Sequence, residues 1–88
     1  NLNMSVHGAI ISFGKCAATI QTEQQQYYAP YRELDHYVMS ALLLQHPTQK
    51  MEPVLVTFNI DTTRQSGTSN KKPRYYATSV QLREIVYL

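Results

Sequence analysis

Two segments in the last third of the chain alternate apolar and polar side chains, and they restrict the fold more than any other feature. Val54–Asp61 places β-branched and aromatic residues on one face, and Tyr75–Leu88 alternates in the same way. A period of two with these residue types is typical of half-buried strands. The polar loop Thr62–Pro73 joins the two segments, so the sequence predicts a protruding β-hairpin.

The first third of the chain predicts two further strands. Met4–Phe13 alternates with a slight irregularity, and Gly8 within it indicates a bulge or bend. Cys16–Thr22 also alternates, after a turn at Gly14. Gln21–Arg32 is polar and rich in tyrosine, which favours an exposed loop or a strand extension beyond the core.

Leu34–His46 satisfies two periodicities at once. Leu34, Val38 and Leu42 fit a helical stripe, and the segment is rich in good helix formers. Alternate residues of the same segment also fit a strand. On local grounds the two alternatives are evenly matched.

The chain of 88 residues has the length of one domain, residues 1–88, and its 43% of apolar residues can build a core. The longest apolar runs are too short to cross a membrane, so we expect no membrane contact. Cys16 is the single cysteine, which favours a reducing compartment and an intracellular protein. The net charge of +2 is too small to indicate a nucleic-acid partner by itself.

The residues that could carry catalysis do not form a recognisable constellation. Six carboxylates, at positions 23, 33, 35, 52, 61 and 84, are not spaced as an acid–base pair. The histidines at 7, 36 and 46 lack metal-ligand spacing, and no phosphate loop or nucleophile motif is present. We therefore expect a protein that is not an enzyme and that needs no cofactor or metal.

The C-terminal segments contain a set of residues that points to a known family: Val54-Leu55-Val56, Asp61-Thr62-Thr63-Arg64, Gly67, Lys72, Arg74-Tyr75-Tyr76, Thr78, Val80, Glu84-Ile85 and Tyr87-Leu88. With these residues the segments resemble the last hairpin of the bacterial and mitochondrial single-stranded-DNA-binding protein family, whose members have an OB fold. Asp35-His36-Tyr37-Val38 is similar to the third strand of that family. The chain departs from the family in having no tryptophan for base stacking.

The resemblance implies an all-β fold: a five-stranded antiparallel Greek-key OB-fold barrel with little or no helix. It favours a strand for Leu34–His46. The predicted core residues are Val6, Ile10, Ile20, Val38, Val54, Val56, Phe58, Val80 and Ile85. OB domains of the kinetoplastid RNA-editing complex are similar near Asp35-His36 and Lys72–Gln81, which extends the expectation to RNA editing and to a mitochondrial location.

Basic and aromatic residues gather on the predicted hairpin and on the tyrosine-rich segment. Single strands bind by stacking bases on aromatic rings beside a cationic groove. The residues expected to bind single-stranded DNA or RNA are Arg64, Lys71, Lys72, Arg74, Tyr75, Tyr76, Tyr27, Tyr28 and Arg32. Neighbouring strand residues point to opposite faces, so only one of Tyr75 and Tyr76 can be available to a base.

The alternative function is assembly: a module that pairs with itself or with another OB domain and binds little nucleic acid of its own. A short barrel with exposed strand edges invites pairing, and tyrosine and arginine are common at interface hot spots. The residues expected at such an interface are Leu42, Leu43, Leu44, Tyr87 and Leu88. A homo- or hetero-oligomer would then follow.

Overall fold

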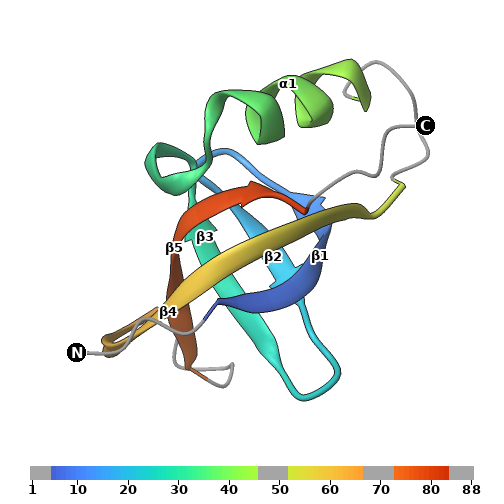
Figure 1. Cartoon of the computed structure of the whole chain (residues 1–88). Helices are drawn as coiled ribbons and strands as arrows, with labels where there is room; N and C mark the ends of the chain where they lie inside the picture. Colours follow the sequence, from blue (N-terminus) through green and yellow to red (C-terminus); the bar gives the residue numbers. More distant parts are fainter. Residues whose placement is uncertain (1–4, 46–51, 67–72, 84–88) are drawn as a thin grey trace.

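The alternating segments of the sequence form strands that close into a barrel. The computed structural model describes residues 5–45, 52–66 and 73–83. Its strands are β1 (Val6–Phe13), β2 (Ala17–Gln21), β3 (Gln26–Pro30), β4 (Val54–Ser66) and β5 (Arg74–Leu82). Two helical segments, η1 (Tyr31–Glu33) and α1 (His36–Gln45), lie between β3 and β4 (Figure 1).

The strands follow one another around the barrel in the order β1-β2-β3-β5-β4, and β4 returns to β1. Every seam is antiparallel except β3–β5, which is parallel. The fold class is therefore confirmed as an all-β, five-stranded OB-like barrel, with one parallel seam among its antiparallel ones. Among the described residues, neither helical segment has the length and apolar character needed to span a membrane.

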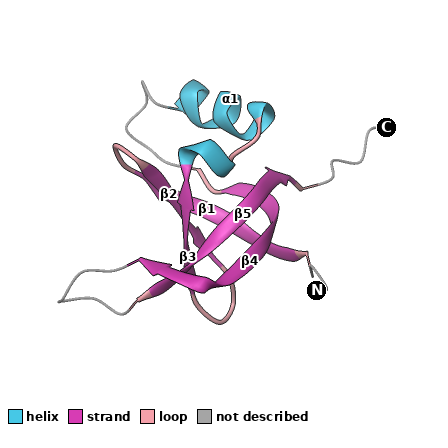
Figure 2. Ribbon diagram, turned by 90° about the vertical axis from the view of Figure 1, so that its left-hand side faces the viewer, coloured by secondary structure: helices cyan, strands magenta, loops and turns pink. Residues whose placement is uncertain are grey.

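The interpretation of Leu34–His46 as a strand is wrong. Asp35 caps a helix there, because its Oδ1 accepts the backbone N–H of Val38 at 2.9 Å and satisfies one donor of the first turn. Helix α1 then lies over one end of the barrel (Figure 2). Val38 and Leu42 are buried in the core there.

The third strand comes instead from Gln26–Pro30, part of the segment that we interpreted as a loop or strand extension. Thr22 and Gln25 close a tight turn before it, since the N–H of Thr22 donates to the carbonyl of Gln25 at 3.0 Å. Asp35-His36-Tyr37-Val38 thus does not form the third strand. The barrel still has five strands, because β3 is the third strand. Helix α1 covers one end of the barrel.

The core is a single cluster to which all five strands and α1 contribute. Its buried members are Ile10, Ala18, Ile20, Tyr27, Ala29, Leu34, Val38, Leu42, Val54, Val56, Phe58, Ala77 and Val80. Seven of the predicted core residues, Ile10, Ile20, Val38, Val54, Val56, Phe58 and Val80, are confirmed as buried. Val6 is half-buried against the cluster, and Ile85 lies outside the described residues.

Gly8 faces the packed interior and does not form the bulge of β1, which falls between Ile10 and Ser12. A Cβ at position 8 would lie 2.8 Å from Cγ2 of Ile20 and 3.1 Å from Cε1 of Phe58. Glycine is therefore needed here for close approach of neighbouring side chains.

Candidate nucleic-acid interface

Side chains from four strands form a connected row on the outside of the barrel. The row consists of Thr19 on β2, Tyr28 on β3, Arg74 and Tyr76 on β5, and Arg64 on β4, and we call it the aromatic–arginine ladder. Strand register places its members next to one another, because Thr19 pairs with Tyr28 and Tyr28 pairs with Tyr76. Residues paired across a seam project from the same face of a sheet.

Two tyrosine rings contact each other in the ladder, and a guanidinium group lies over each of them. The rings of Tyr28 and Tyr76 have centroids 5.0 Å apart and planes tilted by 59°. Arg64 lies over the ring of Tyr76 at 4.2 Å, and Arg74 lies over that of Tyr28 at 5.7 Å. Arg74 also donates a hydrogen bond of 3.1 Å from Nη1 to Oγ1 of Thr19.

Strand alternation explains why the two tyrosines face outward. On β3, Tyr27 and Ala29 are buried, so Tyr28 between them must point away from the core. On β5, Ala77 is buried and Tyr76 precedes it on the opposite face. Tyr28 and Tyr76 are both half-buried, since each covers part of the other and leaves the rest of its ring accessible.

One carboxylate belongs to the same face. Asp61 pairs with Tyr76 across the β4–β5 seam. Hydrogen bonds from the hydroxyl and the backbone N–H of Thr63, and then the positive charge of Arg64, lower the pKa of the Asp61 carboxyl below its ordinary value. Asp61 is therefore ionised at neutral pH and places one negative charge beside the ladder.

A short turn between β1 and β2 borders the ladder. A hollow of about 360 Å³ lies beside it, lined by Gly14, Lys15, Cys16, Ala17, Ala18, Thr19, Tyr28 and Arg74. The aromatic wall of this hollow is Tyr28, and its cationic residues are Lys15 and Arg74. Such a combination is suited to a ligand with flat rings and negative charges.

Four of the residues predicted to bind nucleic acid lie together in the ladder: Arg64, Arg74, Tyr28 and Tyr76. Lys71 and Lys72 lie outside the described residues. Sequence reasoning missed Thr19 and Lys15, whose residue types carry no signal until the strand register is known.

The remaining predicted residues lie elsewhere. Tyr27 is a core residue, 4% exposed, and its ring packs against Phe58 with centroids 5.2 Å apart. Tyr75 is half-buried against the core, whereas Arg32 is exposed in η1. We therefore exclude Tyr27 from the candidate interface, since its ring packs in the core on the opposite face of β3 from Tyr28.

The three leucines predicted at an interface all lie on α1, but they differ in exposure. Leu42 is buried against the barrel, whereas Leu43 and Leu44 are 61% and 80% exposed on α1. Tyr37, on the same helix, is 66% exposed. Tyr87 and Leu88 lie outside the described residues.

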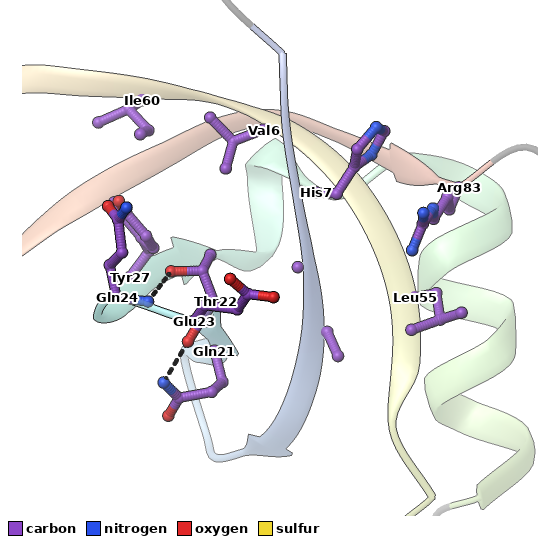
Figure 3. A pocket seen from close by; sticks show the side chains of 12 residues that line it. Val6, His7, Gln21, Thr22, Glu23, Gln24, Tyr27, Leu55, Ile60 and Arg83 are labelled. Atoms are coloured by element: carbon purple, nitrogen blue, oxygen red, sulfur yellow. Dashed lines mark hydrogen bonds between the residues drawn. The ribbon is translucent and has the colours of Figure 1, made fainter.

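A larger hollow of about 640 Å³ surrounds β1 on another part of the barrel. Figure 3 shows Gln21, Thr22, Glu23 and Gln24 on one side of β1, with His7, Leu55 and Arg83 on the other. Its charged groups, Glu23 and Arg83, are thus separated by the strand and do not converge on one point. The ladder remains the better candidate site.

In the part of the chain that the structure describes, no three histidine, cysteine, aspartate or glutamate side chains gather where they could hold a metal ion. Comparison with known proteins identifies no relative from which a function could be transferred. No family model, no curated protein and no solved structure matches this chain.

Proposed function

We propose that the domain binds single-stranded nucleic acid, DNA or RNA, on the aromatic–arginine ladder. The observation that carries the proposal is the contact between Tyr28 and Tyr76, flanked by the guanidinium groups of Arg64 and Arg74. Base stacking on an aromatic ring contributes about 1–3 kcal/mol per base, and cationic groups beside the rings attract the phosphates. The ladder offers both within one surface.

The position of the ladder also supports the proposal. OB folds bind oligonucleotides on the face of strands 2 and 3, between the loop after strand 1 and the loop after strand 4. Thr19 and Tyr28 occupy that face, and Lys15 lies in the first of those loops. The resemblance of the C-terminal hairpin to single-stranded-DNA-binding proteins is a second reason for the proposal, and the kinetoplastid resemblance suggests an RNA-editing complex in a mitochondrion as one setting.

The stacking part of the proposal is tested by fluorescence anisotropy with a labelled twelve-nucleotide single strand. Tyr28→Ala and Tyr76→Ala should each weaken binding by about fivefold or more, because each removes a stacking surface. Tyr37→Ala is the matched control, since it removes an exposed ring from α1, outside the ladder. Equal affinities for all four proteins would refute stacking on the ladder.

The electrostatic part is tested by repeating the titration between 50 and 200 mM salt. Arg74→Ala should make the dependence of log affinity on log salt shallower by about 0.7, the value for one phosphate contact on a single strand. Arg83→Ala is the control, because Arg83 is exposed beside the other hollow. If Arg83→Ala reduces the salt dependence and Arg74→Ala leaves it unchanged, the nucleic acid binds outside the ladder.

A second function, assembly with another protein chain, is supported by the outer surface of α1. Leu43, Leu44 and Tyr37 expose large apolar side chains on that helix, which is typical of protein-binding surfaces. Sedimentation at micromolar concentration should then show an oligomer that Leu44→Glu dissociates. If the wild-type protein is monomeric and does not bind other OB domains, the assembly function is refuted.

A further inference from the structure

The turn between β1 and β2 is held in place on both of its sides. The N–H of Gly14 donates to the carbonyl of Ala17 at 2.9 Å, which closes the turn on itself. The hydroxyl of Tyr31 donates to the carbonyl of Gly14, and the N–H of Tyr31 donates to the carbonyl of Cys16 at 3.2 Å. These bonds tie the turn to η1 and fix its position between the ladder and α1.

The turn separates two hollows that share Gly14 and Lys15. The first is the hollow beside the ladder, with Tyr28 as its aromatic wall. The second, which we call the apolar hollow, has a volume of about 590 Å³ and lies between the turn and α1. Its remaining lining residues are Phe13, Tyr31, Met39, Leu42 and Leu43.

The charges around the two hollows favour an anionic ligand. Among the described residues that line them, Lys15 and Arg74 are the charged side chains and none is a carboxylate. An apolar peptide would account for the apolar hollow and leave both cations without a role. A polymer that alternates phosphates with flat, weakly polar bases accounts for both features.

We propose that a single strand bound on the ladder continues over the turn at Lys15 and places its next base in the apolar hollow. Lys15 then contacts the phosphate that links this base to the base stacked on Tyr28. The apolar hollow, at about 590 Å³, is large enough to hold a base, since ligand pockets have volumes of about 300–1,000 Å³. This inference rests on the proposed function and adds to it a subsite that the ladder does not contain.

The path of the strand can be located by photocrosslinking. A 5-iodouracil base is placed at each position in turn of a twelve-nucleotide single strand bound to the wild-type protein, and the crosslinked residue is identified by mass spectrometry. One position should crosslink to Tyr28 or Tyr76, and a neighbouring position should crosslink to Phe13 or Tyr31. Crosslinks confined to Tyr28 and Tyr76 would overturn the inference and leave the proposed function intact.

The energetic contribution of the apolar hollow is tested by anisotropy with the same strand. Leu43→Ala should weaken binding by about fivefold, within the range for loss of one base contact, and should leave the fold intact because Leu43 is 61% exposed. Leu44→Ala is the matched control, since Leu44 is a neighbouring exposed leucine that does not line the hollow.

The remaining outcomes separate this inference from the function on which it rests. Equal affinities for Leu43→Ala, Leu44→Ala and wild type would overturn the inference, even where Tyr28→Ala weakens binding. Absence of binding to any single strand would overturn the proposed function and the inference together. If Leu43→Ala changes only the sedimentation of the protein, the hollow belongs to a protein interface and the inference is wrong.

Discussion

Ser79 adopts a backbone conformation that residues with a side chain rarely take, with a φ of 51°. It lies where β5 carries one residue more than β4, since Gln81 pairs with Thr57 and Thr78 pairs with Asn59. This bulge turns Val80 into the core, and the N–H of Ser79 donates to Oε1 of Glu33 at 3.2 Å. The strained residue thus makes the bend that closes β5 over the barrel.

Replacing Ser79 by glycine should raise the free energy of unfolding. A left-handed conformation costs an L-residue about 1–2 kcal/mol, and the greater freedom of glycine in the unfolded chain offsets part of the gain. We expect a net increase of about 0.5 kcal/mol in urea denaturation. Ser79→Ala is the control: it removes the hydroxyl and keeps the Cβ, so it should give no gain.

Asp61→Asn should strengthen binding of a single strand. The carboxylate of Asp61 lies beside the ladder, and its lowered pKa keeps it charged throughout the physiological range. Removing that charge should raise affinity by about twofold at low salt and by less at high salt, since salt screens charges at the surface. Glu23→Gln, at the other hollow, should have no such effect in the same anisotropy titration.

Sequence reasoning placed four ladder residues in the candidate site but could not decide between Tyr27 and Tyr28. A shift of one residue in strand register exchanges the inner and outer faces, so a tyrosine pair can be resolved only when the register is known. The polar neighbours of these tyrosines favoured a loop. The signal that was available is the alternation of Tyr27 and Ala29 with the polar Gln26.

Helix α1 shows a different reason for an incorrect prediction. Its outward residues include Tyr37, Leu43 and Leu44, so no polar face distinguishes the helix from a buried strand. The distinguishing signal was Asp35, an N-cap residue directly before His36–Gln45. The strand prediction follows from the family resemblance, whereas period alone predicts the strands of the C-terminal hairpin.

Leu42→Ala should destabilise the domain far more than substitution of the neighbouring leucines. Leu42 is 2% exposed where α1 meets the barrel, so its truncation leaves a cavity and costs about 2–5 kcal/mol. Leu43→Ala and Leu44→Ala should each change the free energy of unfolding by less than about 0.5 kcal/mol. Equal losses at all three positions in urea denaturation would contradict the helical register.

Tyr31→Phe should loosen the turn between β1 and β2 and change how stability depends on alkaline pH. Burial, and then the electrostatic effect of Cys16, raise the pKa of Tyr31 above its ordinary value of 10.0. The unfolded chain therefore loses the phenol proton first, and stability falls as pH rises from about 10 through the raised pKa.

The phenylalanine variant lacks this titration, so its stability should decline less over the same pH range. Below pH 10 it should be less stable than wild type by about 0.5–1.5 kcal/mol, because the bond to the Gly14 carbonyl is lost. Urea denaturation at a series of pH values measures both effects. A parallel decline in the two proteins would show that Tyr31 does not cause the alkaline loss.

The seams that close the whole barrel differ in length. β1 and β4 pair over five positions, from Val6↔Phe58 to Ile10↔Val54. β3 and β5 pair at Tyr28↔Tyr76, and the bridge Leu34↔Val80 extends the same contact beyond β3. Among the described residues, the parallel seam is therefore the one with the fewest backbone pairs.

Hydrogen exchange should detect this difference. We expect the amides at the β3–β5 seam to exchange through openings of lower free energy than those of the β1–β4 seam, because local opening follows the weakest pairing. Native-state exchange followed by nuclear magnetic resonance resolves the two groups. Equal opening energies at both seams would mean that the barrel opens only as a unit.

The shortest seam of the barrel is also the one that the ladder crosses, since Tyr28 belongs to β3 and Tyr76 to β5. A single-stranded nucleic acid stacked on both rings would hold β3 and β5 together where few backbone bonds join them. Its binding free energy would then raise the free energy of opening at that seam, so binding should slow amide exchange more at β3–β5 than at β1–β4. A nucleic-acid chain would thereby complete a closure that the polypeptide makes only weakly.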